Sequence, residues 1–197
     1  MRNKITSILT ACLLLLTGCR VQMATELPVR QQAPTGIRIE ITGTVFLKDK
    51  ELIVDGQSNL PKDAIMFAGL KEYGDHESYA RVINWQGEED MEYVTESTGV
   101  VDEKGHFQIK VDRVNPDKRY KMEVLFNPGI QKSKIQEKYG LWGENIAATI
   151  GQTEFKHNGR TVTGMIKVAP IVNITDPSGN GAKWNLTDVF KKSRPIK

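Results

Sequence analysis

Asp75, His76 and Glu77 place three possible metal ligands side by side in the sequence. A structural or catalytic zinc site needs three or four such side chains that converge on one ion. Adjacent side chains of an extended segment point in different directions, so this trio predicts a solvated loop. We therefore expect no metal site, and a metal-handling protein stays an alternative that would need His76 to meet a second histidine in the fold.

Residues 176–181 begin like a calcium-binding loop. Side-chain oxygens stand at its first, third and fifth positions, and glycine at its sixth: Asp176, Ser178, Asn180 and Gly181. However, only Asp176 is charged, and Thr187 occupies the position where a calcium loop carries a bidentate glutamate. Proline, serine and glycine also make ordinary turns. The stretch is interpreted as a turn, with calcium binding left open.

The remaining histidines indicate no catalytic group. His106 follows a turn, and His157 precedes Asn158-Gly159, itself a turn signal, so both are predicted to be solvated. The sequence contains no Gly-x-Ser-x-Gly nucleophile motif. We expect no catalytic residues, no cofactor and no enzymatic activity. A hydrolase whose triad is assembled only by folding is the alternative.

Aromatic residues give a softer signal. Tyr139 and Trp142 lie in a glycine-containing segment, residues 139–144, that interrupts the strand pattern. Loops carried on a rigid scaffold often hold binding residues, so we predict that both side chains form part of a partner-binding edge. The alternative is that Trp142 closes one end of the hydrophobic core.

The N-terminus has the pattern of a secretory signal peptide. Arg2 and Lys4 form a basic head, and the mostly apolar residues 5–16 follow. This run is shorter than the ~20 residues that a membrane-spanning helix needs. It ends in Leu16-Thr17-Gly18-Cys19.

The string Leu16-Thr17-Gly18-Cys19 resembles the lipobox of bacterial lipoproteins. The resemblance implies that residues 1–18 are removed, that Cys19 receives a diacylglyceryl group, and that fatty acids such as palmitate hold the protein on the membrane outside the cytoplasm. Two acyl chains anchor a protein stably. A second match ending at Cys12 follows too short an apolar run. Secretion without a lipid remains the alternative.

Signal removal changes the charge and the cysteine count. The full chain has 27 basic and 24 acidic residues, and loss of Arg2 and Lys4 lowers its net charge from +3 to +1. A nearly neutral protein is not expected to bind nucleic acid. Cys19 would be the one remaining cysteine, consumed by the lipid, so no disulfide is expected.

Strand patterns begin at residue 37. Residues 20–36 lack apolar periodicity and are interpreted as a flexible tether. Apolar residues then alternate or cluster in short runs, which are predicted as strands: residues 37–47, 51–55, 64–70, 79–85, 92–101, 120–126 and 160–168. Residues 98–111 are predicted as a hairpin turning at Gly105.

Alternation also predicts which side chains enter the core. Phe107, Ile109 and Val111 are expected to point inward. In residues 120–126, the even-numbered side chains share one face, whereas Arg119, Lys121 and Glu123 share the other.

Seven or eight short strands with turns between them predict an all-β, antiparallel sandwich. The order of turns in residues 37–126 resembles immunoglobulin-like or transthyretin-like domains of bacterial surface proteins. The predicted organisation is a signal peptide (1–18), a tether (19–36), an immunoglobulin-like sandwich (37–172) and a C-terminal extension (173–197).

Two short helices are expected. Residues 133–139 combine a Ser133–Gln136 capping box with Gly140 as the stop, and they turn Ile135 and Tyr139 to one face. A second helix is predicted over residues 185–192.

The sequence thus predicts a lipid-anchored binding or structural module at the cell envelope. Its expected partners are the membrane, through the lipid, and an unidentified protein or envelope component. A cell-envelope enzyme and a metal-handling lipoprotein are the two alternatives.

Overall fold

The computed structural model describes residues 36–88, 92–172 and 183–189 of the chain. The strands in these ranges are β1 Ile41–Lys48, β2 Glu51–Ser58, β3 Ile65–Glu72, β4 Thr95–Val100, β5 His106–Asp112, β6 Tyr120–Phe126, β7 Gln152–His157, β8 Arg160–Ile171, β9 Lys183–Asn185 and β10 Thr187–Asp188. The helices are α1 Tyr79–Ile83, the 3-10 turn η1 Pro128–Ile130, and α2 Ser133–Tyr139.

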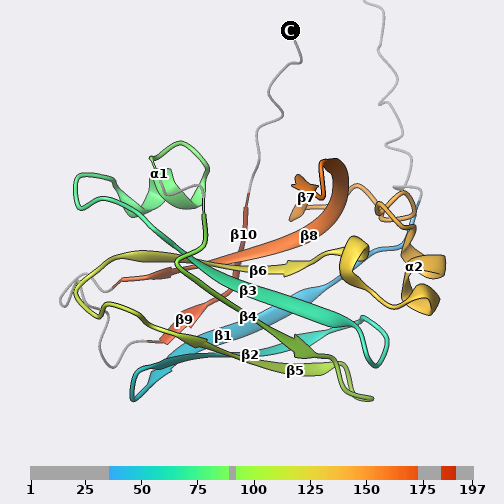
Figure 1. Ribbon diagram of the computed structural model, residues 1–197, viewed down its shortest axis with the longest axis horizontal. Helices are drawn as coiled ribbons and strands as arrows, with labels where there is room; N and C mark the ends of the chain where they lie inside the picture. The colour runs from blue at the N-terminus through green and yellow to red at the C-terminus, as the bar shows by residue number, and fades with distance from the viewer. Residues whose placement is uncertain (1–35, 89–91, 173–182, 190–197) are drawn as a thin grey trace, which may run out of the picture. The chain divides into compact units, whose positions relative to one another are not determined.

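The strands form two antiparallel sheets. The smaller sheet has the order β5-β2-β1-β9, and the larger has the order β10-β8-β6-β3-β4, with β7 also paired to β8. In Figure 1 the smaller sheet runs below the larger one, α1 lies above the larger sheet, and α2 lies at the right-hand end. The predicted all-β sandwich is confirmed.

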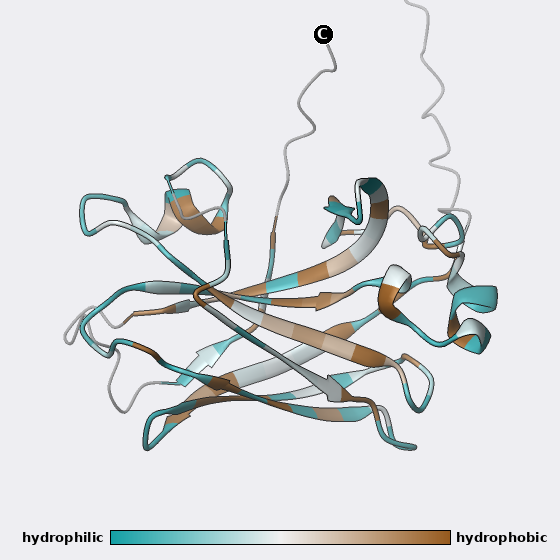
Figure 2. Cartoon of the chain, viewed as in Figure 1, coloured by the Kyte–Doolittle hydropathy of each residue, from teal (hydrophilic) through white to brown (hydrophobic). Residues whose placement is uncertain are grey.

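The inner faces of the two sheets enclose the main hydrophobic core. Val45 and Val54 from the smaller sheet and Met66 and Met122 from the larger one are all fully buried. Hydrophobic and hydrophilic residues alternate along the strands, whereas the loops are mostly hydrophilic (Figure 2). The three β5 residues predicted to point inward are confirmed as core, each 1% exposed: Phe107, Ile109 and Val111.

The outer face of the larger sheet carries a second hydrophobic cluster. Its buried members are Leu125, Ile166, Val168 and Val189. They pack against partly buried side chains that include Ile83, at the end of α1, and Trp85, just beyond it. Lys121 and Glu123 do share one face of β6, as predicted. That face is buried rather than solvated, because the segment that contains α1 lies over it.

Residues 79–85 were predicted as a strand, and this prediction is wrong. Tyr79–Ile83 form α1, whose N-cap Ser78 accepts a hydrogen bond from the Arg81 amide at 3.3 Å. A serine in this position satisfies an amide that would otherwise lack an intrahelical partner. The single turn buries Val82.

The pairing predicted for residues 98–111 is also wrong, although the turn is correct. Gly105 has the expected positive φ of 81°. Yet β4 pairs with β3 in the larger sheet, whereas β5 pairs with β2 in the smaller one. A Cβ atom on Gly99 would overlap the Gln108 carbonyl oxygen, so the two strands cross closely at the sandwich edge instead of forming a ladder.

Helix α2 occupies the predicted residues but begins differently. Its N-cap is Lys132, without a side-chain cap, and Gln136 donates instead to the Pro128 carbonyl at 3.1 Å. The predicted Ser133–Gln136 capping box is therefore wrong. Gly140 ends the helix with φ of 85°, and Ile135 and Tyr139 are its buried residues, as predicted.

The helix predicted from residue 185 is wrong for the residues described there. Residues 183–189 belong to the sandwich instead of an extension, because β9 pairs with β1 and β10 pairs with β8. The signal peptide, Cys19, nearly all of the tether and the loop 176–181 lie outside the described residues. Within the described ranges, no helix has the length and hydrophobicity to cross a membrane.

Candidate binding groove

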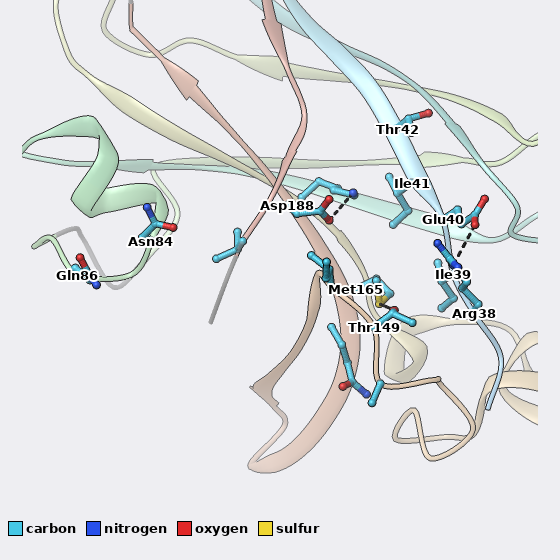
Figure 3. Close-up of a pocket in the computed structure, with 15 residues that line it drawn as sticks. Arg38, Ile39, Glu40, Ile41, Thr42, Asn84, Gln86, Thr149, Met165 and Asp188 are labelled. Carbon is cyan, nitrogen blue, oxygen red and sulfur yellow. Dashed lines mark hydrogen bonds and ion pairs between the residues drawn. The ribbon is translucent and has the colours of Figure 1, made fainter. Parts of the chain in front are cut away.

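A groove of about 1080 Å³ lies beside the start of β1. Its lining comes from residues 38–42, the segment after α1, residues 148–152, β8 and residues 188–189. Figure 3 shows Ile39 and Ile41 on one side, Asn84 and Gln86 on the other, and Asp188 between them. The groove therefore lies where the edges of the two sheets meet.

Charged side chains of the groove are paired with one another. Arg38 Nε lies 3.1 Å from Glu40 Oε1 at the exposed rim. Lys167 Nζ lies 2.5 Å from Asp188 Oδ1, and the Lys167 side chain is only 14% exposed. A charged ligand would have to displace a partner of the partly buried Lys167–Asp188 pair, so the floor of the groove favours an uncharged ligand, whereas the exposed Arg38–Glu40 pair adds little to this preference.

The rest of the lining is mixed. Ile39, Ile41, Met165 and Val189 are all at most 4% exposed and form the apolar part, whereas Ile150 stands 60% exposed at the rim. Thr149, Asn84, Gln86 and Gln152 add neutral polar groups. Binding sites commonly combine an apolar lining with a few polar groups that orient the ligand.

Sequence reasoning missed this groove. Its residues come from separate segments, and none of these segments carries a motif with a chemical signature. Alternation of Ile37, Ile39 and Ile41 predicted a strand. It could not show that one edge of this strand faces an opening.

The two predicted partner-binding aromatics lie elsewhere. Tyr139 is 1% exposed, and its ring packs edge-on against Phe126 at 5.1 Å between centroids. Trp142 is partly exposed, and the Arg160 guanidinium lies 4.8 Å from the centre of its ring. Neither lines the groove. Only Trp142 therefore remains a surface candidate for the predicted edge.

His76 and Glu77 meet Glu88 instead of Asp75. His76 Nε2 lies 4.0 Å from Glu77 Oε1 and 3.9 Å from Glu88 Oε2. Two ligands of one tetrahedral ion would lie roughly 3.3 Å apart. Arg81 forms an ion pair with Glu77 at 3.5 Å, and the His76 side chain is 72% exposed. These groups form a polar cluster in which the Glu77 carboxylate is buried, at 4% exposure, whereas His76 and Glu88 lie at the surface.

His106 also belongs to a charged network, on the smaller sheet. Its Nε2 lies 2.9 Å from Asp55 Oδ1, and its backbone amide donates to Asp102 Oδ1 at 2.9 Å. This backbone hydrogen bond, with a second one from Lys104, holds the pKa of Asp102 below its usual value. The network fixes the turn before β5.

Comparison with known proteins gives no relative for this chain: no family model, curated protein or solved structure matches it.

Proposed function

We propose that this protein is a membrane-anchored lipoprotein, facing outside the cytoplasm, that acts as a binding module at the cell envelope. Its lipid is attached through Cys19, and its binding site is the groove beside β1. The lipobox-like string at residues 16–19 supports the anchor. The observation that carries the binding role is the groove itself, with its mixed lining and internally paired charges.

A binding role explains this lining better than catalysis does. General acid–base groups must be available to exchange protons with a substrate. In the groove, Lys167 is engaged by Asp188, and Arg38 by Glu40. These ion pairs keep the charged groups of the groove engaged with each other, and Ile39, Ile41 and Met165 form its apolar part.

The groove can be tested by photo-crosslinking on the full-length protein in native membranes. A photoreactive residue replaces Ala148 in the groove or, as a control, Val114, which is 63% exposed and does not line it. We expect discrete crosslinked products at position 148. Ile150→Arg should abolish them, whereas Val114→Arg should leave them intact. Products that ignore Ile150→Arg, or no products at position 148, would refute the groove as the binding site.

The anchor is tested separately. Cys19→Ala should prevent lipid attachment and leave the protein uncleaved or shed from the membrane, as measured by intact-mass spectrometry of membrane and soluble fractions. An unmodified mature Cys19 in native membranes would contradict the lipoprotein assignment. Turnover of an envelope substrate that is lost on replacing one groove carboxylate would instead favour the enzyme alternative.

A further inference from the structure

Backbone groups alternate between the two edges of the extended chain that runs from Ile37 into β1. Glu40 bonds to Asn59 on the β2 side, where the Asn59 amide donates to its carbonyl at 3.3 Å and the Asn59 side chain accepts from its amide at 2.9 Å. Ile41 is opposite Ser58, but the Ser58 amide turns the other way and donates to Gly105 at 2.8 Å. Antiparallel ladders alternate in this way, so the backbone groups of the odd-numbered residues 37–43 point toward the other edge.

That other edge is paired at both ends of the groove. Ile37 donates to the Asn145 carbonyl at 2.7 Å and accepts from the Ala147 amide at 3.0 Å. Further along, Gly43 accepts from the Leu186 amide at 2.9 Å, where β9 begins to pair with β1.

Between these two ends, Ile39 and Ile41 have open backbone groups. No residue in the described part of the chain pairs with their amides or carbonyls on the groove side. Both residues are buried, at 3% and 2% exposure. Buried backbone groups are nearly always hydrogen-bonded, so the groups of Ile39 and Ile41 are candidates for pairing with a further strand.

The opening has the length and direction of a short strand. From Ile37 to Gly43 the chain spans roughly 20 Å, room for about four or five extended residues between the two closed ends. β9 runs antiparallel to β1 but leaves it after Asn185, and the chain then pairs with β8 as β10. An incoming strand antiparallel to β1 would occupy the positions that β9 leaves open.

We propose that the groove binds an extended, uncharged polypeptide segment of a partner protein, which adds to the smaller sheet as a strand antiparallel to β1. The inference rests on the proposed binding function and names its ligand class. Main-chain hydrogen bonds to Ile39 and Ile41 would supply recognition, as in other cases of strand addition. Alternate side chains would face either the apolar lining or the neutral polar groups of the rim.

The regular spacing of these donors and acceptors selects a polypeptide. Each open residue presents an amide and a carbonyl to the same side, and the pattern repeats every second residue, as in a strand. The charged groups of the groove are already paired, which disfavours a charged segment.

The test uses a phage-displayed library of random heptapeptides and the full-length protein solubilised in detergent. Peptides are selected on the wild-type protein and depleted on the Ile150→Arg variant, with Val114→Arg as the matched control. We expect selected sequences to alternate apolar and uncharged polar residues. Peptide binding should slow hydrogen exchange of the Ile39 and Ile41 amides but leave that of Val114 unchanged.

Backbone methylation then separates strand addition from simple filling of the groove. Synthetic copies of a selected peptide are N-methylated at alternate residues, in the two possible phases. Methylation on the β1-facing edge should weaken binding at least about tenfold, because hydrogen bonds are lost there, and the opposite phase should cost less than about threefold.

The outcomes distinguish the two proposals. Equal effects of both methylation phases, or no groove-dependent peptides, would overturn strand addition. If crosslinking at position 148 still depended on Ile150, the groove would remain the binding site for another ligand. Binding that appeared only on self-association of the protein would assign the edge to a second copy and would also overturn the proposal.

Discussion

Lys121 Nζ lies 2.8 Å from Glu123 Oε1, and both side chains are buried on the outer face of the larger sheet. The Lys121 ammonium also lies 4.0 Å from the centre of the Trp85 ring. Tyr93 donates its hydroxyl to Glu123 Oε2 at 2.7 Å. These contacts attach the segment around α1 to β6, so two charged side chains on the face opposite the main core form a buried structural centre.

Replacing Glu123 by Ala should strongly destabilise the fold. Lys121 and the nearby Lys71 ammonium would lose a buried counter-charge, and such a loss costs about 3–5 kcal/mol. The free energy of unfolding in urea measures this change. Glu154→Ala on β7, where the side chain is exposed, should stay within about 0.5 kcal/mol. A cost below about 1 kcal/mol for Glu123→Ala would contradict a structural role for the pair.

Phe107 and Gly56 should behave as one packing unit. A Cβ atom on Gly56 would overlap the Phe107 ring, which is 1% exposed. Phe107→Ala should therefore cost about 3–5 kcal/mol through lost burial and a cavity. Gly56→Ala should cost about 1–3 kcal/mol by overpacking.

The double variant provides the sharper measurement. With the ring removed, the added methyl group has space, so Gly56→Ala should cost much less in the Phe107→Ala background. Urea unfolding of the four proteins gives the coupling free energy. Strictly additive costs would show that the ring and the glycine do not limit each other.

The sequence predicted the sandwich because alternation reports directly which side of a strand is buried. It worked for β5, where Phe107, Ile109 and Val111 face the core. In β6 alternation correctly placed Lys121 and Glu123 on one face, but it gave no sign that this outer face is buried. Only the packing of the distant segment around Trp85 shows that they are buried.

The site was harder to predict for a similar reason. Strand order is a long-range property, and a one-dimensional pattern cannot show which strand edge is left without a neighbour. Ile39 and Ile41 look like any other strand residues in the sequence. Likewise, the turn before His106 was correctly located, but nothing local indicates that it joins two different sheets.

Asp102 should make the stability of the protein sensitive to acid. The backbone amide of His106, and then that of Lys104, bond its carboxylate and hold its pKa below the usual 3.8. A lowered folded pKa means that the stabilisation is complete above the unfolded value and is lost as the pH falls through the folded value. Asp102→Asn keeps an oxygen acceptor but does not titrate.

The lowered pKa of Asp102 sets the direction of the expected change with pH. Between about pH 5 and pH 2, the stability advantage of the wild type over Asp102→Asn should shrink steadily. Urea unfolding at several pH values measures it, and Asp112→Asn at the end of β5 serves as the control for an exposed carboxylate. An advantage that stayed constant, or grew toward low pH, would show that the turn does not depend on the charge of Asp102.

Tyr139→Ala and Trp142→Ala should differ in how much unfolding free energy they cost. Tyr139 is core, so Tyr139→Ala should cost about 3–5 kcal/mol of unfolding free energy, as for other buried aromatics. Trp142→Ala removes a partly exposed ring and its cation–π contact with Arg160. Such a contact is worth about 0.5–1 kcal/mol at an exposed site. Thermal and urea unfolding of both variants compare these costs, and Leu141→Ala, at an exposed neighbouring position, serves as the control.

If Trp142→Ala unfolds the protein as readily as Tyr139→Ala, Trp142 closes the core and is not part of a binding edge. If it leaves stability intact and reduces crosslinking to envelope partners, the surface around Trp142 is a second contact site beside the groove.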